Sequence, residues 1–279
     1  AAETVALSNT KIVANASDAT LPTPNSVGSE LVERAHRPDF TPMRLSADIE
    51  ITAEKVALVN GTVIQADTTG GADAGSITLN VGTLKTAAGP DGRVVVTSTS
   101  NCQGCPGGQP GDIIIQGIPE VTPTALRRYV WVGRSRGEAG DVFEYYLARS
   151  LDLHGTDIHA NAFGNAPGAI VMMRTQGQAA FTDTTVSVTT QDFTIHGNKP
   201  NGEFARNAGF SRIDIIAQDI ALKDSTIAAD AKVSDIGSCP LCQGGPSAGE
   251  IWLRAQNSVT ADNSSITNTN NQNATLNPQ

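Results

Sequence analysis

Apolar and polar residues alternate in short runs along this chain, most clearly between Gly249 and Thr269. A period of two is typical of β-strands with one buried face. Small or polar residues separate the runs, so the stretch predicts three short strands joined by two polar bends. The apolar positions of these runs are Ile251, Leu253, Val259, Ala261 and Ile266.

The same pattern recurs upstream, in residues 211–230 and 47–66. A unit of about twenty residues cannot bury its own apolar face, and it needs a copy stacked against it. We therefore expect the corresponding residues Ile51, Ile215 and Ile251 to line up in one column. Further units are expected to start near residues 75, 111, 140 and 168.

The stacked units predict an all-β fold, a right-handed parallel β-helix (solenoid) of about seven coils. Loops are expected at one corner of the stack, where an insertion disturbs no strand pairing. The expected organisation is an irregular N-terminal arm or cap over residues 1–46, the β-helix with its loop insertions over 47–270, and a polar C-terminal tail over 271–279.

The repeat has the form G-D-I-x-I-x-A-x-x-I-x-L-x-x-S-x-I-x-A, with Gly-rich inserts before the next G-[DE]-I. This phrase resembles the repeat of filamentous-haemagglutinin-type exoproteins of bacteria, often exported by two-partner secretion. The resemblance covers about residues 47–270 and rests on core-facing positions. It implies a secreted parallel β-helix with a role in adhesion or surface structure rather than in catalysis.

Composition agrees with thin, stacked strands, since 39% of residues are hydrophobic but only 4% are aromatic. The net charge of −9 argues against a nucleic-acid partner, which requires a basic surface. No apolar run approaches the roughly 20 residues needed for membrane insertion. The chain opens on small residues without methionine, so we expect a mature extracellular or cell-surface protein after signal-peptide removal.

Two C-x-x-C pairs each precede a Gly-Gly turn and the start of a unit. If those units are about four steps apart, at roughly 4.8 Å per step, the pairs lie on the order of 19 Å apart, too far for a shared metal ion. We expect two local disulfides, with a metal site and free thiols as the alternatives. No cofactor is expected. The cysteines concerned are Cys102, Cys105, Cys239 and Cys242.

Candidate catalytic residues are sparse. Polysaccharide-active enzymes with stacked strands place acids, histidines and basic residues on neighbouring units, and the nearest set here is Asp157, His159, Asp192 and Arg212. A polysaccharide lyase or hydrolase is therefore the alternative function. The bland interpretation is that these are solvated outward positions.

Other polar positions predict structural roles. Asn257, Asn263 and neighbouring Asn or Asp residues at bends are expected to stack as side-chain ladders and to tolerate left-handed backbone. Trp252 lies between Ile251 and Leu253, so its ring is expected to point outward.

The resulting functional expectation is a non-catalytic, adhesin-like surface protein or a subunit of an extracellular fibre. In the first case its loops bind a surface or glycan ligand, and in the second the molecules self-associate head to tail into a homopolymer. The residues expected at the assembly edge are Gly249, Ile251, Leu253, Asn263 and Ile266.

Overall fold

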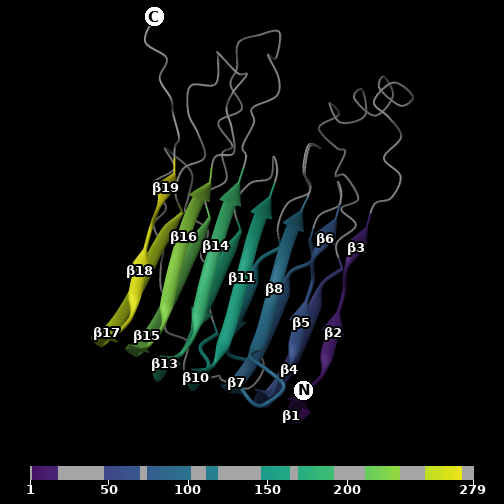
Figure 1. Cartoon of the computed structure of the whole chain (residues 1–279). Coiled ribbons are helices and arrows are strands. Elements are labelled where there is room, and N and C mark those ends of the chain that lie inside the picture. Colours follow the sequence, from purple (N-terminus) through teal and green to yellow (C-terminus); the bar gives the residue numbers. More distant parts are fainter. Residues whose placement is uncertain are drawn as a thin grey trace, which may run out of the picture.

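The computed structural model describes residues 2–17, 47–69, 74–101, 111–118, 146–163, 169–191, 211–232 and 249–271. The described part is all-β, as expected, and its named strands pair in parallel within two sheets (Figure 1). The first sheet, sheet A, contains β1 (Ala2–Ser8), β4 (Ile49–Val59), β7 (Ile77–Ala87), β9 (Ile113–Gln116), β10 (Ser150–His154), β12 (Ile170–Arg174), β13 (Gln178–Thr182), β15 (Arg212–Lys223) and β17 (Glu250–Asp262).

The second sheet, sheet B, runs in the order β18-β16-β14-β11-β8-β5-β2, with three shorter contributions from β3, β6 and β19. Its strands are β2 (Lys11–Val13), β3 (Ala16–Ser17), β5 (Val63–Gln65), β6 (Thr68–Thr69), β8 (Val94–Asn101), β11 (Thr156–Phe163), β14 (Thr185–Gln191), β16 (Thr226–Lys232), β18 (Ser265–Thr267) and β19 (Asn270–Asn271).

Six strands of sheet A close into a ring, in the order β7-β10-β13-β15-β12-β9 and back to β7. Closure is possible because β7 and β15 are long. β7 pairs with β9 through Ile77–Asn80 and with β10 through Thr83–Lys85, and β15 likewise pairs with both β12 and β13. Outside the ring, β4 and β1 continue from β7, and β17 continues from β15.

The predicted right-handed parallel β-helix of about seven coils is therefore wrong: the ring is a closed six-stranded parallel β-barrel beside a parallel sheet. Periodicity reports which residues of a strand are buried, but it does not report whether the order of strands closes on itself. The irregular N-terminal arm is also wrong for residues 2–17, which form β1, β2 and β3 and pair with β4, β5 and β6.

Aliphatic side chains from both sheets form one core, in which residues of neighbouring strands lie opposite one another. Ile51 and Ile215 share a column, but Ile251 pairs with Ile213, and Leu253 takes the place opposite Ile215. The expected column of Ile51, Ile215 and Ile251 is thus wrong by two residues. A shift of two keeps the same side chains inward, so alternation alone does not fix it.

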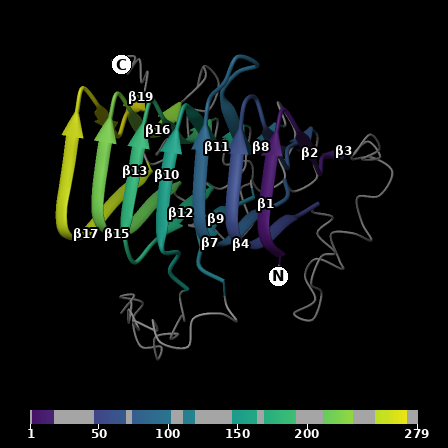
Figure 2. The ribbon, with the colours of Figure 1, turned by 90° about the horizontal axis from the view of Figure 1, so that it is seen from below.

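The two sheets lie one behind the other (Figures 1 and 2). The strands of each sheet stand side by side in a row, which runs from the N-terminal strands in purple to the C-terminal strands in yellow. β1 and β2 stand at one end of the rows, and β17 and β18 stand at the other. Among the described residues, no helix has the length and apolar character required to cross a membrane.

Candidate functional site

Left-handed residues follow the strands of sheet A at one corner. Each comes directly after a strand and turns the chain toward sheet B. Asn263 lies at φ 45° and donates its Nδ2 hydrogen to Asp224 Oδ1 at 2.7 Å. Asn257 donates to Asp219 Oδ2 at 3.3 Å, so both predicted ladder positions form side-chain pairs. The bend with left-handed backbone expected at Asn257 is wrong, because this residue lies within β17 and is not among those with positive φ. The corner residues with positive φ are Asn9, Asn60, Gly155, Asp183, Asp224 and Asn263.

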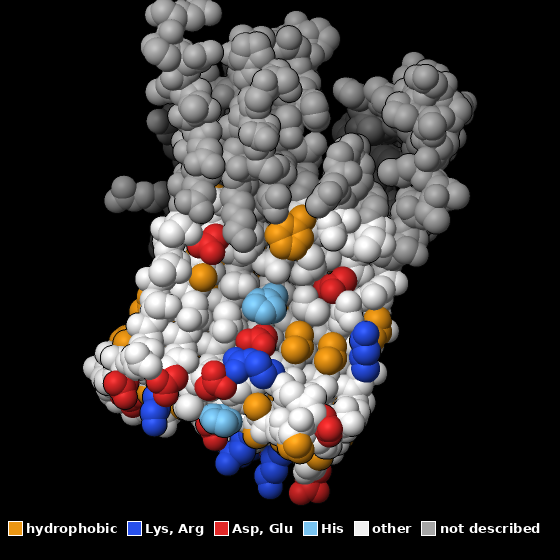
Figure 3. Space-filling model, in the orientation of Figure 1, with side chains coloured by type: hydrophobic (Ala, Val, Ile, Leu, Met, Phe, Trp, Pro, Cys, Tyr) orange, Lys and Arg blue, Asp and Glu red, His pale blue; other side chains and the backbone are white. Residues whose placement is uncertain are grey.

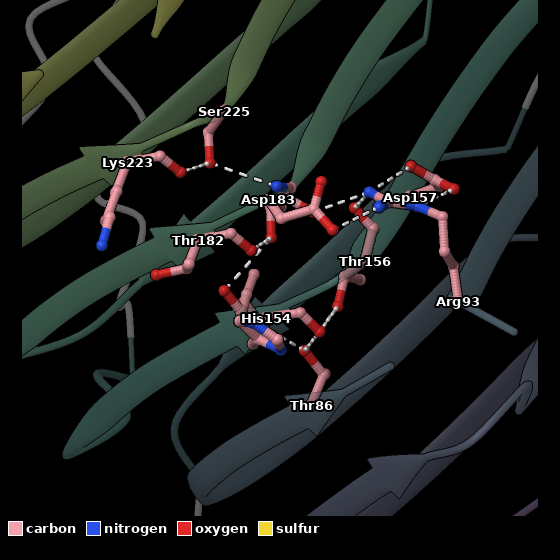
Figure 4. A network of polar contacts seen from close by, with 11 residues as sticks. Thr86, Arg93, His154, Thr156, Asp157, Thr182, Asp183, Lys223 and Ser225 are labelled. Atoms are coloured by element: carbon pink, nitrogen blue, oxygen red, sulfur yellow. Dashed lines mark hydrogen bonds and ion pairs between the residues drawn. The ribbon is translucent and has the colours of Figure 1, made fainter. Parts of the chain in front are cut away.

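Arg93 ties three strands together at this corner (Figure 4). Its Nε and Nη2 contact the carboxylate of Asp157 at 2.8 and 3.0 Å, and its Nη1 contacts Asp183 Oδ2 at 2.7 Å. Nη2 also donates to the backbone oxygen of Asp183. The hydrogen bond to Asp157 is the main reason why the pKa of Arg93 is raised. Asp157 is therefore occupied by a structural cation.

His159 lies two residues beyond Asp157 on β11, on the same outward face. Its Nδ1 is 2.7 Å from Ser187 Oγ of β14. Burial lowers the pKa of His159, and the charge of Arg93 acts in the same direction, whereas Asp157 opposes them. The lowered pKa favours the neutral ring, and its hydrogen bond to Ser187 joins two strands.

The residues of the predicted enzymatic alternative do not form one site in the described part. Asp157 and His159 lie on sheet B, whereas Arg212 lies on β15 of sheet A. Asp192 is outside the described residues. So are Cys102, Cys105, Cys239 and Cys242, and their disulfides stay a prediction.

Trp252 of β17 stacks with two guanidinium groups on the face opposite Ile251 and Leu253. Its ring centroid is 4.1 Å from Cζ of Arg212 and 4.4 Å from Cζ of Arg254. Arg254 also contacts Asp214 Oδ2 at 3.3 Å. The outward orientation predicted for Trp252 is confirmed, and Arg212 is engaged in this stack.

The two ends of the sheets differ from the interior. Within the described residues, β1 pairs only with β4, and β17 pairs only with β15, so each has one edge without a partner strand. All three large hydrophobic residues that are exposed in this part lie on end strands. They are Val13 on β2, Val259 on β17 and Ile266 on β18, exposed by 44%, 47% and 47%.

The predicted assembly residues lie at this C-terminal end. Gly249 is buried just before β17, and its missing side chain allows the close approach of the Ser211 carbonyl. Ile251 and Leu253 are half-buried against the core. Asn263 and Ile266 are exposed.

Sequence reasoning missed Val5, Leu7 and Ile12 at the opposite end, because residues 1–46 were interpreted as an arm. Their alternation with polar neighbours was the available signal. It also missed Arg93, which directly precedes β8. Its carboxylate partners are Asp157 on β11 and Asp183 at the corner before β14.

The front face shows charged side chains of both signs interspersed with neutral ones, without a large patch of one sign (Figure 3). In the part of the chain that the structure describes, no three His, Cys, Asp or Glu side chains are grouped as metal ligands.

Comparisons with protein-family models, curated proteins and solved structures found no match. The resemblance to filamentous-haemagglutinin-type exoproteins therefore stays a prediction.

Proposed function

We propose that this protein is a secreted or cell-surface structural protein whose copies join end to end into an extracellular fibre. The observation that carries the proposal is the state of the two ends: each combines an unpartnered strand edge with apolar side chains that the interior strands bury completely. Ile220 and Ile227 are 0% and 1% exposed, whereas their neighbours Val259 and Ile266 are each 47% exposed.

Parallel strands favour a head-to-tail contact. An unpaired edge is a template for a further strand. Since β1 and β17 run in the same direction, a translated copy brings β1 beside β17 in the parallel orientation that the rest of the sheet uses. Two copies of the same end related by a two-fold axis would instead pair antiparallel. A contact between unlike ends never closes, so repetition gives a fibre.

Burial of apolar side chains and formation of backbone hydrogen bonds both favour this contact. Full burial of a Val or Ile side chain stabilises by about 1.5–3 kcal/mol, so covering the exposed halves of Val259 and Ile266 contributes about 1 kcal/mol each. Each new backbone hydrogen bond contributes about 0.5–1.5 kcal/mol. The cost of association, about 4–15 kcal/mol, opposes these terms. A stable contact therefore requires most of the strand edge to pair.

Other roles have less support. The proposed extracellular location is supported by the resemblance of the repeat to secreted exoproteins, and an adhesin-like role toward a glycan is compatible with that location. A polysaccharide lyase or hydrolase is disfavoured, because Arg93 holds Asp157 and Arg212 stacks on Trp252.

The test uses two blocked variants and a control. The double substitution Val259→Asp and Ile266→Asp blocks the C-terminal end, and Leu7→Asp blocks the N-terminal end. The control, His154→Asp, introduces an aspartate at an exposed position on β10, a strand away from both ends. Electron microscopy and sedimentation velocity are expected to show fibres for wild type and control, and monomers for each blocked variant.

An equimolar mixture of the two blocked variants is expected to give a dimer and nothing longer, because one open N-terminal end and one open C-terminal end remain. Circular dichroism checks that every variant is folded. Wild-type protein that stays monomeric at its highest soluble concentration would refute the proposal, as would fibres formed by either blocked variant alone.

A further inference from the structure

Residues that lie opposite one another on successive strands form columns from one end of the molecule to the other. The strand pairing identifies the first and the last residue of each column. In sheet A one inward column begins at Val5 and ends at Val259. It passes in order through Val56, Leu84, Leu151, Ala179 and Ile220.

Sheet B contains a matching inward column that begins at Ile12 and ends at Ile266. Its intermediate members are Ile64, Val96, Ile158, Val186 and Ile227. Both columns are aliphatic throughout, and in both the interior members are almost completely buried while the terminal members are not.

We infer that the copies join in one register, with Val5 of one molecule opposite Val259 of the next and Ile12 opposite Ile266. This inference rests on the proposed function and specifies its contact. The partner is a second copy of this chain, displaced by translation along the rows. Each inward column then passes from one molecule into the next without a break.

The same register satisfies the corner between the two sheets. Asn9 and Asn263 are the terminal members of the left-handed corner residues, at φ 47° and 45°. The pairing of Val5 with Val259 places Asn9 directly over Asn263. The corner residues Asn263 and Asp224 already pair through their side chains, and Asn9 extends that row with a further amide.

Charged residues at the two ends are compatible with this register. Ser8 is placed opposite Asp262, because both belong to the outward column next to the corner. Lys11 is placed opposite Ser265, through the column that contains Asp157 and Thr226. No two like charges of β1–β2 and β17–β18 stand directly opposite one another, an arrangement that would oppose pairing.

A charge-coupling experiment tests the register. Ser8→Lys and Ser8→Asp are each made in the full chain and again with Asp262→Asn, and the critical concentration for fibres is measured by sedimentation at low ionic strength. Opposite the native Asp262, the Ser8→Asp variant is expected to need about 3- to 10-fold more protein than Ser8→Lys. With Asp262→Asn, that difference is expected to fall below about 1.5-fold.

Ala6 provides the matched control position. It lies on the same outward face of β1, and the register places it opposite the neutral Thr260. Ala6→Lys and Ala6→Asp are expected to differ by less than half as much as the pair at Ser8.

Two failures are distinguishable. Fibres whose Ser8 variants show no coupling to Asp262 would overturn the register while leaving end-to-end assembly in place. Wild-type protein that forms no fibres would overturn both the register and the proposed function.

Discussion

Asp224 occupies a backbone conformation in which the usual ranking of alanine over glycine should reverse. Its φ is 50°, in the left-handed region that asparagine, aspartate and glycine tolerate. Its carboxylate accepts the 2.7 Å hydrogen bond from Asn263 Nδ2. Asp224→Ala loses this bond, worth about 0.5–1.5 kcal/mol, and adds left-handed strain of about 1–2 kcal/mol.

The expected loss for Asp224→Ala is therefore about 1.5–3.5 kcal/mol in the free energy of unfolding. Asp224→Gly also loses the hydrogen bond but has no strain, so it should be more stable than Asp224→Ala by about 1 kcal/mol. The control is Ala221→Gly on the regular part of β15, where glycine should instead cost about 0.5–1 kcal/mol.

Urea denaturation followed by far-UV circular dichroism measures these differences, provided that the slopes with denaturant agree among variants. An Asp224→Ala protein as stable as Asp224→Gly, or more so, would refute the account of the corner.

Two further predictions concern the interior. Phe181 is 1% exposed between Leu153 and Leu222, so Phe181→Ala should cost about 3–5 kcal/mol in the same denaturation assay, whereas Phe163→Ala at a half-buried position should cost less than half as much. Burial raises the pKa of Asp112, despite the opposing hydrogen bond from the Ile170 amide, so its native state favours the neutral acid and the carboxylate costs stability once pH rises above its ordinary pKa of 3.8. Asp112→Asn keeps an acceptor for the 3.0 Å hydrogen bond from the Ile170 amide. Thermal unfolding across pH should therefore show the variant to be more stable than wild type at neutral pH but not at acidic pH. An equal advantage at both pH values would contradict this.

Within the repeated units, the sequence was sufficient to predict which aliphatic residues face the core. Ile213 and Ile215 alternate with residues on the opposite face, and both are completely buried. The bend residue Asn263 was likewise predictable, because asparagine is one of the few non-glycine residues that tolerate positive φ.

Closure of the ring was not predictable from the same pattern. It depends on β7 and β15 each pairing with two strands along its length, a contact between segments far apart in the chain. Alternation fixes the inward face of each strand but not its partners. The offset at Ile251 has the same origin, since a two-residue shift leaves every inward side chain inward.

The Arg93 network shows a second limit. Arg93, Asp157 and Asp183 are far apart in sequence, and only the pairing of β8, β11 and β14 brings them together. Asp157 and His159 attracted a catalytic hypothesis because their residue types suit acid–base chemistry. In the structure Asp157 binds the guanidinium of Arg93, and His159 pairs with the hydroxyl of Ser187. Both contacts join neighbouring strands of the sheet.

Equivalent aliphatic residues are buried on interior strands but half-exposed on the C-terminal end strands. Val56 and Ile64 each lie in the second row from the N-terminal end and are 2% and 0% exposed. Val259 and Ile266 continue the same inward columns at the other end, yet almost half of each side chain meets water. Position in the row, and not residue type, accounts for this difference. The added strand that would remove it must offer an aliphatic residue at both columns at once, and Val5 and Ile12 of a second copy meet that requirement.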